Sequence, residues 1–201
     1  RISLALLERR LRKQRFETLN FPYSIQKSSI EEIVDDLHRF VQQRVSTSTY
    51  HFVGHSLGNV IVREGFKREY REGLGRIVML APPNQLPDLA DKLGDNPVYK
   101  FITRDSGQKL GSPAFYRALP TPTVEFGVIA GDQGQRLTFD EPNDGIVTVA
   151  DTRLEGMADH IVLHHTHTFI MNARDTAEEC VHFLRYGCFR RGVLAHTSPA
   201  G

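Results

Sequence analysis

The chain has 201 residues, of which 40% are hydrophobic and 24% are charged, and its net charge is +1 at pH 7. This length and composition are typical of a globular protein, and we expect residues 1–201 to form a single domain. The balanced charge gives no reason to expect nucleic acid as a partner. No apolar run approaches the ~20 residues that span a bilayer, which argues against membrane insertion but leaves transient contact with a lipid surface open.

Helical and extended patterns alternate along the whole sequence. Apolar periodicity predicts helices at 3–12, 30–41, 57–66 and 176–186, and apolar runs predict strands at 16–21, 50–53, 76–80, 124–130 and 159–163. This alternation predicts an α/β fold with a mainly parallel, doubly wound sheet and helices on both faces. Residues 86–119 contain short helical pieces interrupted by Gly and Pro, and we expect them to form a small helical cap inserted into the domain.

A Gly-x-Ser-x-Gly pattern, Gly54-His55-Ser56-Leu57-Gly58, lies between a predicted strand and a predicted helix. A sharp strand-to-helix turn exposes its serine hydroxyl, and small residues two positions before and after the serine, here Gly54 and Gly58, make room for the turn. The unpaired N–H groups of the following helix favour negative charge beside the hydroxyl. The pattern therefore predicts that Ser56 is a nucleophile. The alternative is an ordinary connection in which both glycines merely permit tight packing.

A serine nucleophile needs a histidine to remove its proton, and the sequence has several histidines after the strand predicted at 159–163. His164, His165 and His167 lie at or beyond the end of that strand, whereas His160 lies inside it. We favour His167 because it is farthest from the strand and directly precedes an apolar run. Three clustered histidines also suggest a metal site, but no neighbouring Cys or acidic residue completes a recognised ligand spacing, so we expect none.

In enzymes whose nucleophilic serine lies on such a strand-to-helix turn, the carboxylate that orients the histidine lies between the serine and the histidine in the sequence. Asp132 and Asp144 both follow the strand predicted at 124–130. Asp144 is favoured because Pro142 and Gly145 indicate a fixed turn and apolar residues follow it, whereas Asp132 lies between glycines in a turn of mobile type. A solvated turn is the ordinary alternative for either aspartate.

Together these segments resemble the α/β-hydrolase superfamily, in particular its bacterial lipase and esterase branch. The motifs that carry the resemblance are Gly-His-Ser-Leu-Gly at 54–58, Val-Met-Leu-Ala-Pro-Pro-Asn at 78–84, Asn-Asp-Gly-Ile-Val at 143–147 and His-Thr-Phe-Ile-Met at 167–171. The resemblance implies that Ser56 is the nucleophile, Asp144 the orienting acid and His167 the base. It also implies an oxyanion hole that includes the Leu57 N–H, a small-molecule ester or lipid substrate, and no metal or organic cofactor.

The sequence departs from this family in one respect. Such enzymes begin with a strand and a His-Gly loop, which supplies a second oxyanion-hole donor just before the helix that here starts near Ser3. That first strand and loop are missing from the sequence, which starts at Arg1 rather than at a methionine. We expect further residues to precede Arg1 in the native protein, and the sequence therefore leaves the compartment unknown.

The functional prediction from the sequence is a serine carboxylic-ester hydrolase, a lipase or esterase, that works through an acyl-enzyme. An acyltransferase or a thioesterase could use the same three residues, because an alcohol acceptor or a thioester needs no different nucleophile. A non-catalytic binding module that keeps the fold is a third alternative, suggested by the missing strand.

Overall fold

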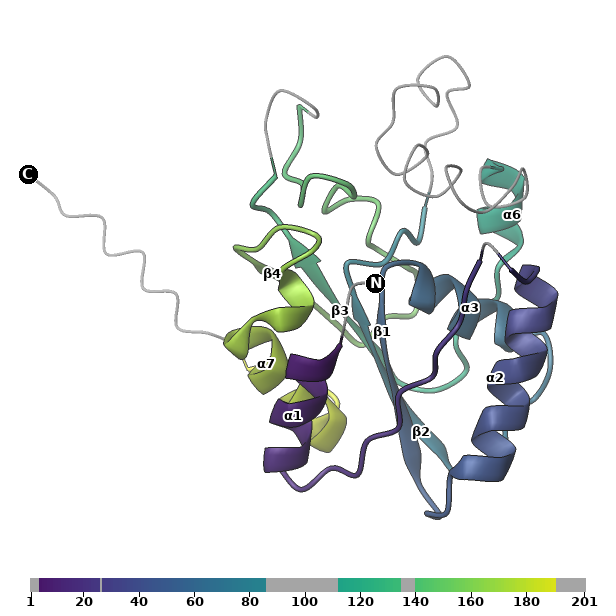
Figure 1. Ribbon diagram of the computed structural model, residues 1–201. Coiled ribbons are helices and arrows are strands. Elements are labelled where there is room, and N and C mark those ends of the chain that lie inside the picture. Colours follow the sequence, from purple (N-terminus) through teal and green to yellow (C-terminus); the bar gives the residue numbers. More distant parts are fainter. Residues whose placement is uncertain (1–3, 26, 86–111, 135–139, 191–201) are drawn as a thin grey trace, which may run out of the picture.

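The computed structural model of the chain describes residues 4–25, 27–85, 112–134 and 140–190. Its elements are α1 (Ala5–Lys13), α2 (Ile30–Arg44), β1 (Tyr50–His55), α3 (Leu57–Gly65), β2 (Leu74–Leu80), α6 (Pro113–Ala118), β3 (Phe126–Gly131), β4 (Asp159–Leu163), η2 (Ile170–Asn172) and α7 (Arg174–Tyr186). The four strands form one sheet in the order β1-β2-β3-β4, and every neighbouring pair is parallel (Figure 1). The predicted parallel sheet is therefore confirmed.

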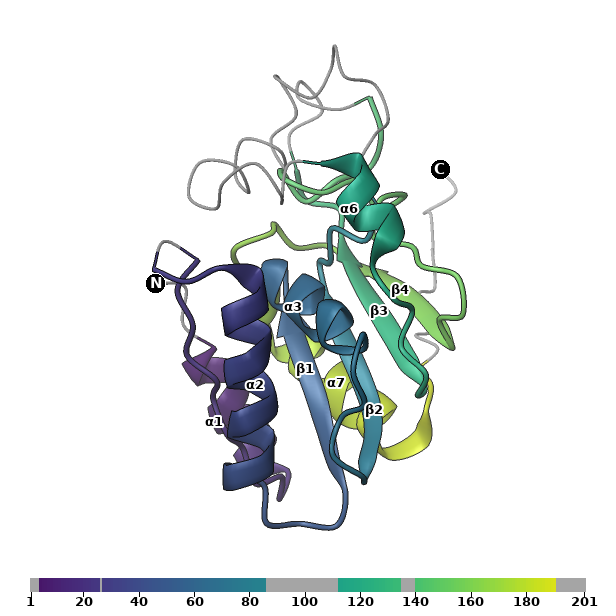
Figure 2. The same ribbon diagram turned by 90° about the vertical axis from the view of Figure 1, so that its right-hand side faces the viewer.

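Helices cover both faces of this sheet. Figure 2 shows α3 in front of the strands and α7 behind them. The last four residues of β2 are buried, and successive side chains of a strand point to opposite faces of the sheet. Ile77 and Met79 pack into the cluster that contains residues of α2 and α3, whereas Val78 and Leu80 pack into the cluster that contains residues of α1 and α7. The predicted doubly wound α/β fold is thus confirmed.

Helix α2 is fixed at its start by a capping box. The Ser29 side chain accepts a hydrogen bond from the Glu32 N–H, and the Glu32 carboxylate accepts one from the Ser29 N–H in return. Apolar residues along one face of α2 are buried: Ile30, Ile33, Val34, Leu37 and Val41.

The helix has 15 residues. In the described part of the chain, no helix is both long and apolar enough to cross a membrane.

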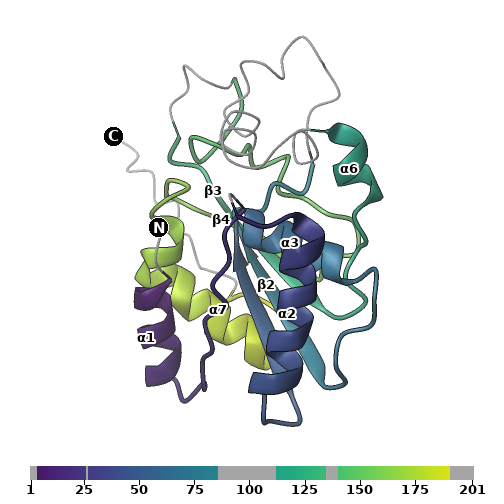
Figure 3. The same cartoon turned by 45° about the vertical axis from the view of Figure 1, so that its right-hand side comes forward.

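The strand predicted at residues 16–21 is not present. These residues form no ladder and instead connect α1 to α2; in Figure 3 they run between α1 on one side and α2 on the other. Phe16 packs against the α1 and α7 cluster, whereas Phe21 packs against the α2 and α3 cluster. The segment therefore crosses from one face of the sheet to the other, and its apolar residues pack against the core on each side. An apolar pattern in the sequence does not distinguish such a connection from a paired strand.

The predicted cap at 86–119 falls largely outside the described residues, which resume at residue 112. The described end of this region contains the short helix α6, which begins with Pro113 at its first turn. Tyr116 and Leu119 are buried in the cluster that also contains residues of α3. The cap, and its place within a single domain of residues 1–201, therefore stay predictions.

Replacing the capping serine tests the start of α2. In Ser29→Ala the Glu32 N–H loses its acceptor, and we expect the free energy of unfolding to fall by about 1 kcal/mol. Urea unfolding followed by circular dichroism measures this change. Ser28→Ala is the matched control and should leave the transition unchanged; an equal loss in both variants would contradict the assignment of the cap.

Candidate active site

The three residues singled out in the sequence lie at the same end of the sheet. Ser56 directly follows β1, Asp144 lies in the chain between β3 and β4, and His167 lies in the loop between β4 and η2. Because all four strands are parallel, their carboxyl ends meet along one edge, and ligands of such sheets bind outside this edge.

Ser56 occupies a strained turn between β1 and α3. Its φ is 51° and its ψ is −122°, a conformation that non-glycine residues rarely adopt and that costs of order 1–3 kcal/mol. The Ser56 N–H still donates to the Leu80 carbonyl at 2.9 Å, which extends the pairing of β1 with β2. The Asn59 side-chain amide donates to the carbonyls of both Ser56 and Leu80, at 3.2 and 3.1 Å. These bonds hold the turn in place.

The two glycines of the pattern differ in their surroundings. A Cβ atom on Gly54 would lie 2.2 Å from the side-chain oxygen of Asn59, a distance that real Cβ atoms do not show. A Cβ atom on Gly58 would meet only the Tyr23 hydroxyl, at an ordinary contact distance of 3.7 Å. The geometry therefore gives a steric reason for glycine at position 54 and none at position 58.

A continuous chain of hydrogen bonds joins Ser56, His167 and Asp144. The Ser56 Oγ lies 2.9 Å from His167 Nε2, and His167 Nδ1 lies 2.7 Å from Asp144 Oδ2. The other Asp144 oxygen accepts the backbone N–H groups of Ile146 and Val147, at 2.9 and 2.7 Å. Since a carboxylate accepts, we assign the ring proton to Nδ1, which leaves Nε2 to accept from the serine hydroxyl.

The other two loop histidines are paired with different aspartates. His164 bonds Asp132 at 2.9 Å, with the two side chains 75% and 37% exposed, and His165 bonds Asp175 at 2.8 Å. In the pair of His167 with Asp144 the side chains are 2% and 1% exposed. Among the described residues no group of three or more His, Cys, Asp or Glu side chains is arranged to hold a metal ion. Burial therefore distinguishes the His167 pair from the other two.

Two solved structures resemble this chain in fold. One is a lipase-esterase related protein from Clostridium acetobutylicum ATCC 824, with a TM-score of 0.52, 14% identity, and coverage of 90% of this chain and 88% of that one. The other is the Bacillus licheniformis lipase BlEst2 in its mature form, with a TM-score of 0.53, 16% identity, and coverage of 78% and 73%. The chain has the α/β-hydrolase fold. Its sequence matches no protein-family model and no curated protein.

Two residues that shape this end of the α/β-hydrolase fold were not singled out from the sequence. A Cβ atom on Gly131, at the end of β3, would lie 2.5 Å from the His165 carbonyl oxygen and 2.9 Å from the Asp144 Cβ. His55, the last residue of β1, places its Nε2 2.9 Å from the carbonyl oxygen of His167. Gly131 directly follows a predicted strand, a weak signal, but no local pattern links His55 to a residue 112 positions later.

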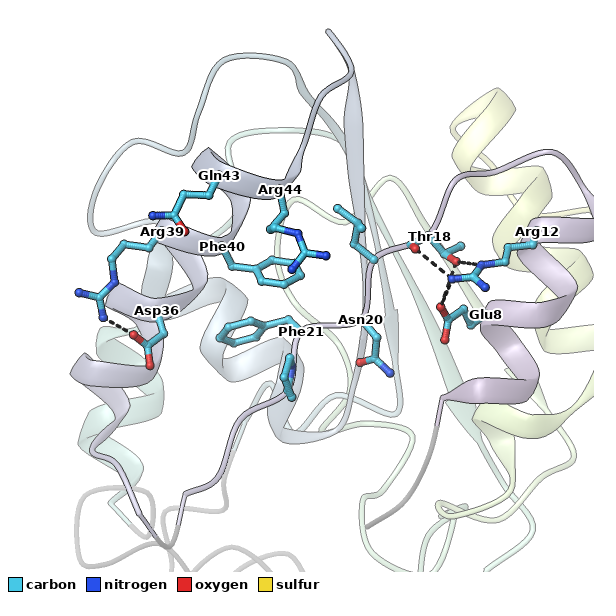
Figure 4. A pocket seen from close by; sticks show the side chains of 12 residues that line it. Glu8, Arg12, Thr18, Asn20, Phe21, Asp36, Arg39, Phe40, Gln43 and Arg44 are labelled. Carbon is cyan, nitrogen blue, oxygen red and sulfur yellow. Dashed lines mark hydrogen bonds and ion pairs between the residues drawn. The ribbon is translucent and has the colours of Figure 1, made fainter.

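A separate groove of about 670 Å³ lies between α1, α2 and the segment that joins them, and the three bonded residues do not line it. Figure 4 shows Glu8 and Arg12 on one side of this groove and Asp36 and Arg39 on the other, each acid bonded to its neighbouring arginine. Its charges are thus partly neutralised within its own walls. The candidate site is therefore the hydrogen-bonded set of Ser56, His167 and Asp144, and this groove is not part of it.

The contrast between the two glycines can be tested directly. Gly54→Ala forces the Asn59 side chain away from its two carbonyl partners, and we expect a loss of about 1–3 kcal/mol in the free energy of unfolding. Gly58→Ala should be neutral, or stabilising by up to about 1 kcal/mol, because alanine favours the helical backbone. Thermal unfolding of both variants measures the difference. Equal destabilisation would show that the second glycine is also required sterically.

Two partly buried histidines, His55 and His160, predict a stability change in acid. Burial is the main cause that lowers the pKa of His55 and of His160 to about 4, compared with 6.5 for a free histidine. Between pH 6.5 and pH 4 the unfolded chain therefore binds protons that the folded chain does not, and stability falls as the pH is lowered through this range. His55→Gln removes one of these groups. We expect urea midpoints at pH 7, 5.5 and 4.5 to decline less steeply in this variant than in the wild type; parallel declines would contradict it.

Proposed function

We propose that this protein is a serine carboxylic-ester hydrolase, a carboxylesterase or lipase, that acts through an acyl-enzyme. The observation that carries the proposal is the buried chain of hydrogen bonds from Ser56 through His167 to Asp144. In this chain a hydroxyl bonds a base and the base bonds a carboxylate that orients it, as nucleophilic catalysis by serine requires. The strained turn that carries Ser56 between β1 and α3 then serves as a nucleophile elbow.

In the first step His167 acts as a general base. Its Nε2, 2.9 Å from the Ser56 Oγ, takes the hydroxyl proton while the oxygen attacks the ester carbonyl carbon. The histidine becomes an imidazolium, and the Asp144 carboxylate, 2.7 Å from Nδ1, stabilises that charge and holds the ring in its tautomer. Because both side chains are buried, water screens this interaction little.

Leu57 supplies a donor to the oxyanion that forms in this step. It is the first residue of α3, and the first N–H groups of a helix have no acceptor within the helix. The positive end of the helix dipole also favours the developing negative charge. A single oxyanion donor is worth about 100- to 1000-fold in turnover, so this backbone group contributes substantially to the proposed rate.

In the remaining steps His167 acts first as a general acid and then again as a general base. The His167 imidazolium gives its proton to the leaving alcohol, and the acyl group stays on Ser56. His167 then takes a proton from a water molecule while the water oxygen attacks the acyl carbon. As the bond between the acyl carbon and the Ser56 Oγ breaks, the His167 imidazolium gives this proton to the Ser56 Oγ and the acid is released. The residues of this chain thus return to their starting protonation states without a further reagent.

The chemistry of the three residues and the similar structures both support an ester as the substrate. A serine nucleophile with a histidine base suits esters, and the two similar folds are a lipase-esterase related protein and a lipase, which supports lipid esters. We propose a single domain of residues 1–201 in which residues 86–119 form a small cap. Adding alcohols to the assay separates hydrolysis from acyl transfer, since transfer would yield a new ester.

Two aspartates that each bond a histidine provide a matched test. Ser56→Ala should abolish turnover of a short-chain aryl ester. Asp144→Asn should lower kcat by about 10,000-fold, because the amide is uncharged and its NH2 group, facing His167 Nδ1, favours the wrong tautomer of the ring. Asp132→Asn, which alters the exposed pair with His164, should retain wild-type activity. Steady-state kinetics of the three variants measures these effects.

A serine-reactive phosphonate supplies the control that does not depend on a chosen ester. The wild type and Asp132→Asn should be labelled stoichiometrically at Ser56, and Ser56→Ala should not be labelled. Full activity in Ser56→Ala would show that the mechanism is wrong. Absence of both turnover and labelling in the wild type would instead favour a binding module with this fold.

A further inference from the structure

His55 links the strand that carries Ser56 to the loop that carries His167. Its ring Nε2 lies 2.9 Å from the His167 carbonyl oxygen, and the two imidazole rings are 4.9 Å apart between centroids. β1 and β4 are the first and last strands in the order of the sheet, so this bond connects chain segments from opposite edges. It therefore joins parts of the site that strand pairing does not hold directly together.

The direction of this bond fixes the state of the His55 ring. A backbone carbonyl can only accept, so Nε2 must carry a hydrogen. Burial lowers the pKa of His55 to about 4, and the neutral ring with its proton on Nε2 is therefore the form present near neutral pH. In this form His55 donates to the base residue without placing a second positive charge beside the His167 ring.

The bonds of His167 show what the His55 contact adds. The backbone N–H of His167 donates to the Asp144 carbonyl at 2.9 Å, and its ring Nδ1 bonds the Asp144 carboxylate at 2.7 Å. Both bonds fix the base relative to the acid. The bond from His55 fixes it relative to β1, whose next residue is Ser56.

We propose that His55 is a positioning residue that sets the distance between the Ser56 Oγ and His167 Nε2 through its hydrogen bond to the His167 backbone. The role rests on the proposed function, since it concerns the proton transfer between these two atoms. A shift of about 1 Å in such a contact can cost about 100-fold in rate. Loss of the bond also leaves a buried carbonyl without this donor, which drives the loop to rearrange.

Two substitutions separate the hydrogen bond from the volume of the side chain. His55→Phe keeps an aromatic ring but removes the N–H, and we expect kcat for an aryl ester to fall by about 100-fold while KM changes by less than about threefold. His55→Gln keeps an N–H close to the position of Nε2, and it should restore kcat to within about threefold of the wild type. If His55→Phe does not fold, His55→Asn replaces it, because its shorter amide does not reach the carbonyl.

The outcomes that overturn the proposal are specific. Wild-type kcat in His55→Phe, or an equal loss in His55→Phe and His55→Gln, shows that the bond does not position the base. If the wild type neither hydrolyses esters nor reacts with the phosphonate, the proposed function fails, and proton NMR then tests the positioning role separately. Exchange of the His167 Nδ1 proton with water should be faster in His55→Phe than in the wild type and His55→Gln; equal exchange rates would overturn the role.

Discussion

The buried hydrogen bond between Asp144 and His167 sets the requirements that the surrounding loops meet. A carboxylate removed from water loses hydration and needs donors for its remaining lone pairs. The backbone N–H groups of Ile146 and Val147 supply two, and the positive φ of 98° at Gly145 turns the chain so that both reach one oxygen. The loops close over β3 because Gly131 has no side chain to separate them. The local backbone thus supplies the hydrogen bonds that the Asp144 carboxylate loses when it is removed from water.

The parallel sheet gives this arrangement its location. Parallel strands need crossover connections, and α3 lies in the connection between β1 and β2. Together with α2, which precedes β1, it covers one face, whereas α1 and α7, from the two ends of the described chain, cover the other, so the end of β2 is buried on both sides. The strands end along one edge, where three different connections deliver a serine, an aspartate and a histidine. Each residue is held by its own loop, so the relative distances depend on bonds between loops. The contact from His55 to the His167 carbonyl is a bond of this kind.

Much of this could be predicted from the sequence, and the failures have a common physical cause. Apolar periodicity located all four strands and the helices around them, although β3 begins at Phe126, two residues later than predicted. The predicted strand at 16–21 was wrong because pairing depends on a neighbour that no local pattern reveals. The same limit concealed the side-chain bond from His55, whose partner lies 112 residues away. Ser56, Asp144 and His167, which the structure joins by hydrogen bonds, could be singled out from the sequence because each lies beside a predicted strand or turn.

The strained turn at Ser56 shows how one position of a short motif depends on a residue outside it. A non-glycine residue with a φ of 51° persists only if other interactions determine the backbone around it. Asn59 provides two such bonds, to the carbonyl of Ser56, which follows β1, and to the carbonyl of Leu80, the last residue of β2. The position of its side chain in turn excludes a Cβ atom from residue 54. Gly54 is therefore required by the group that stabilises the turn, whereas Gly58 lies in regular helix where no neighbour of this kind approaches.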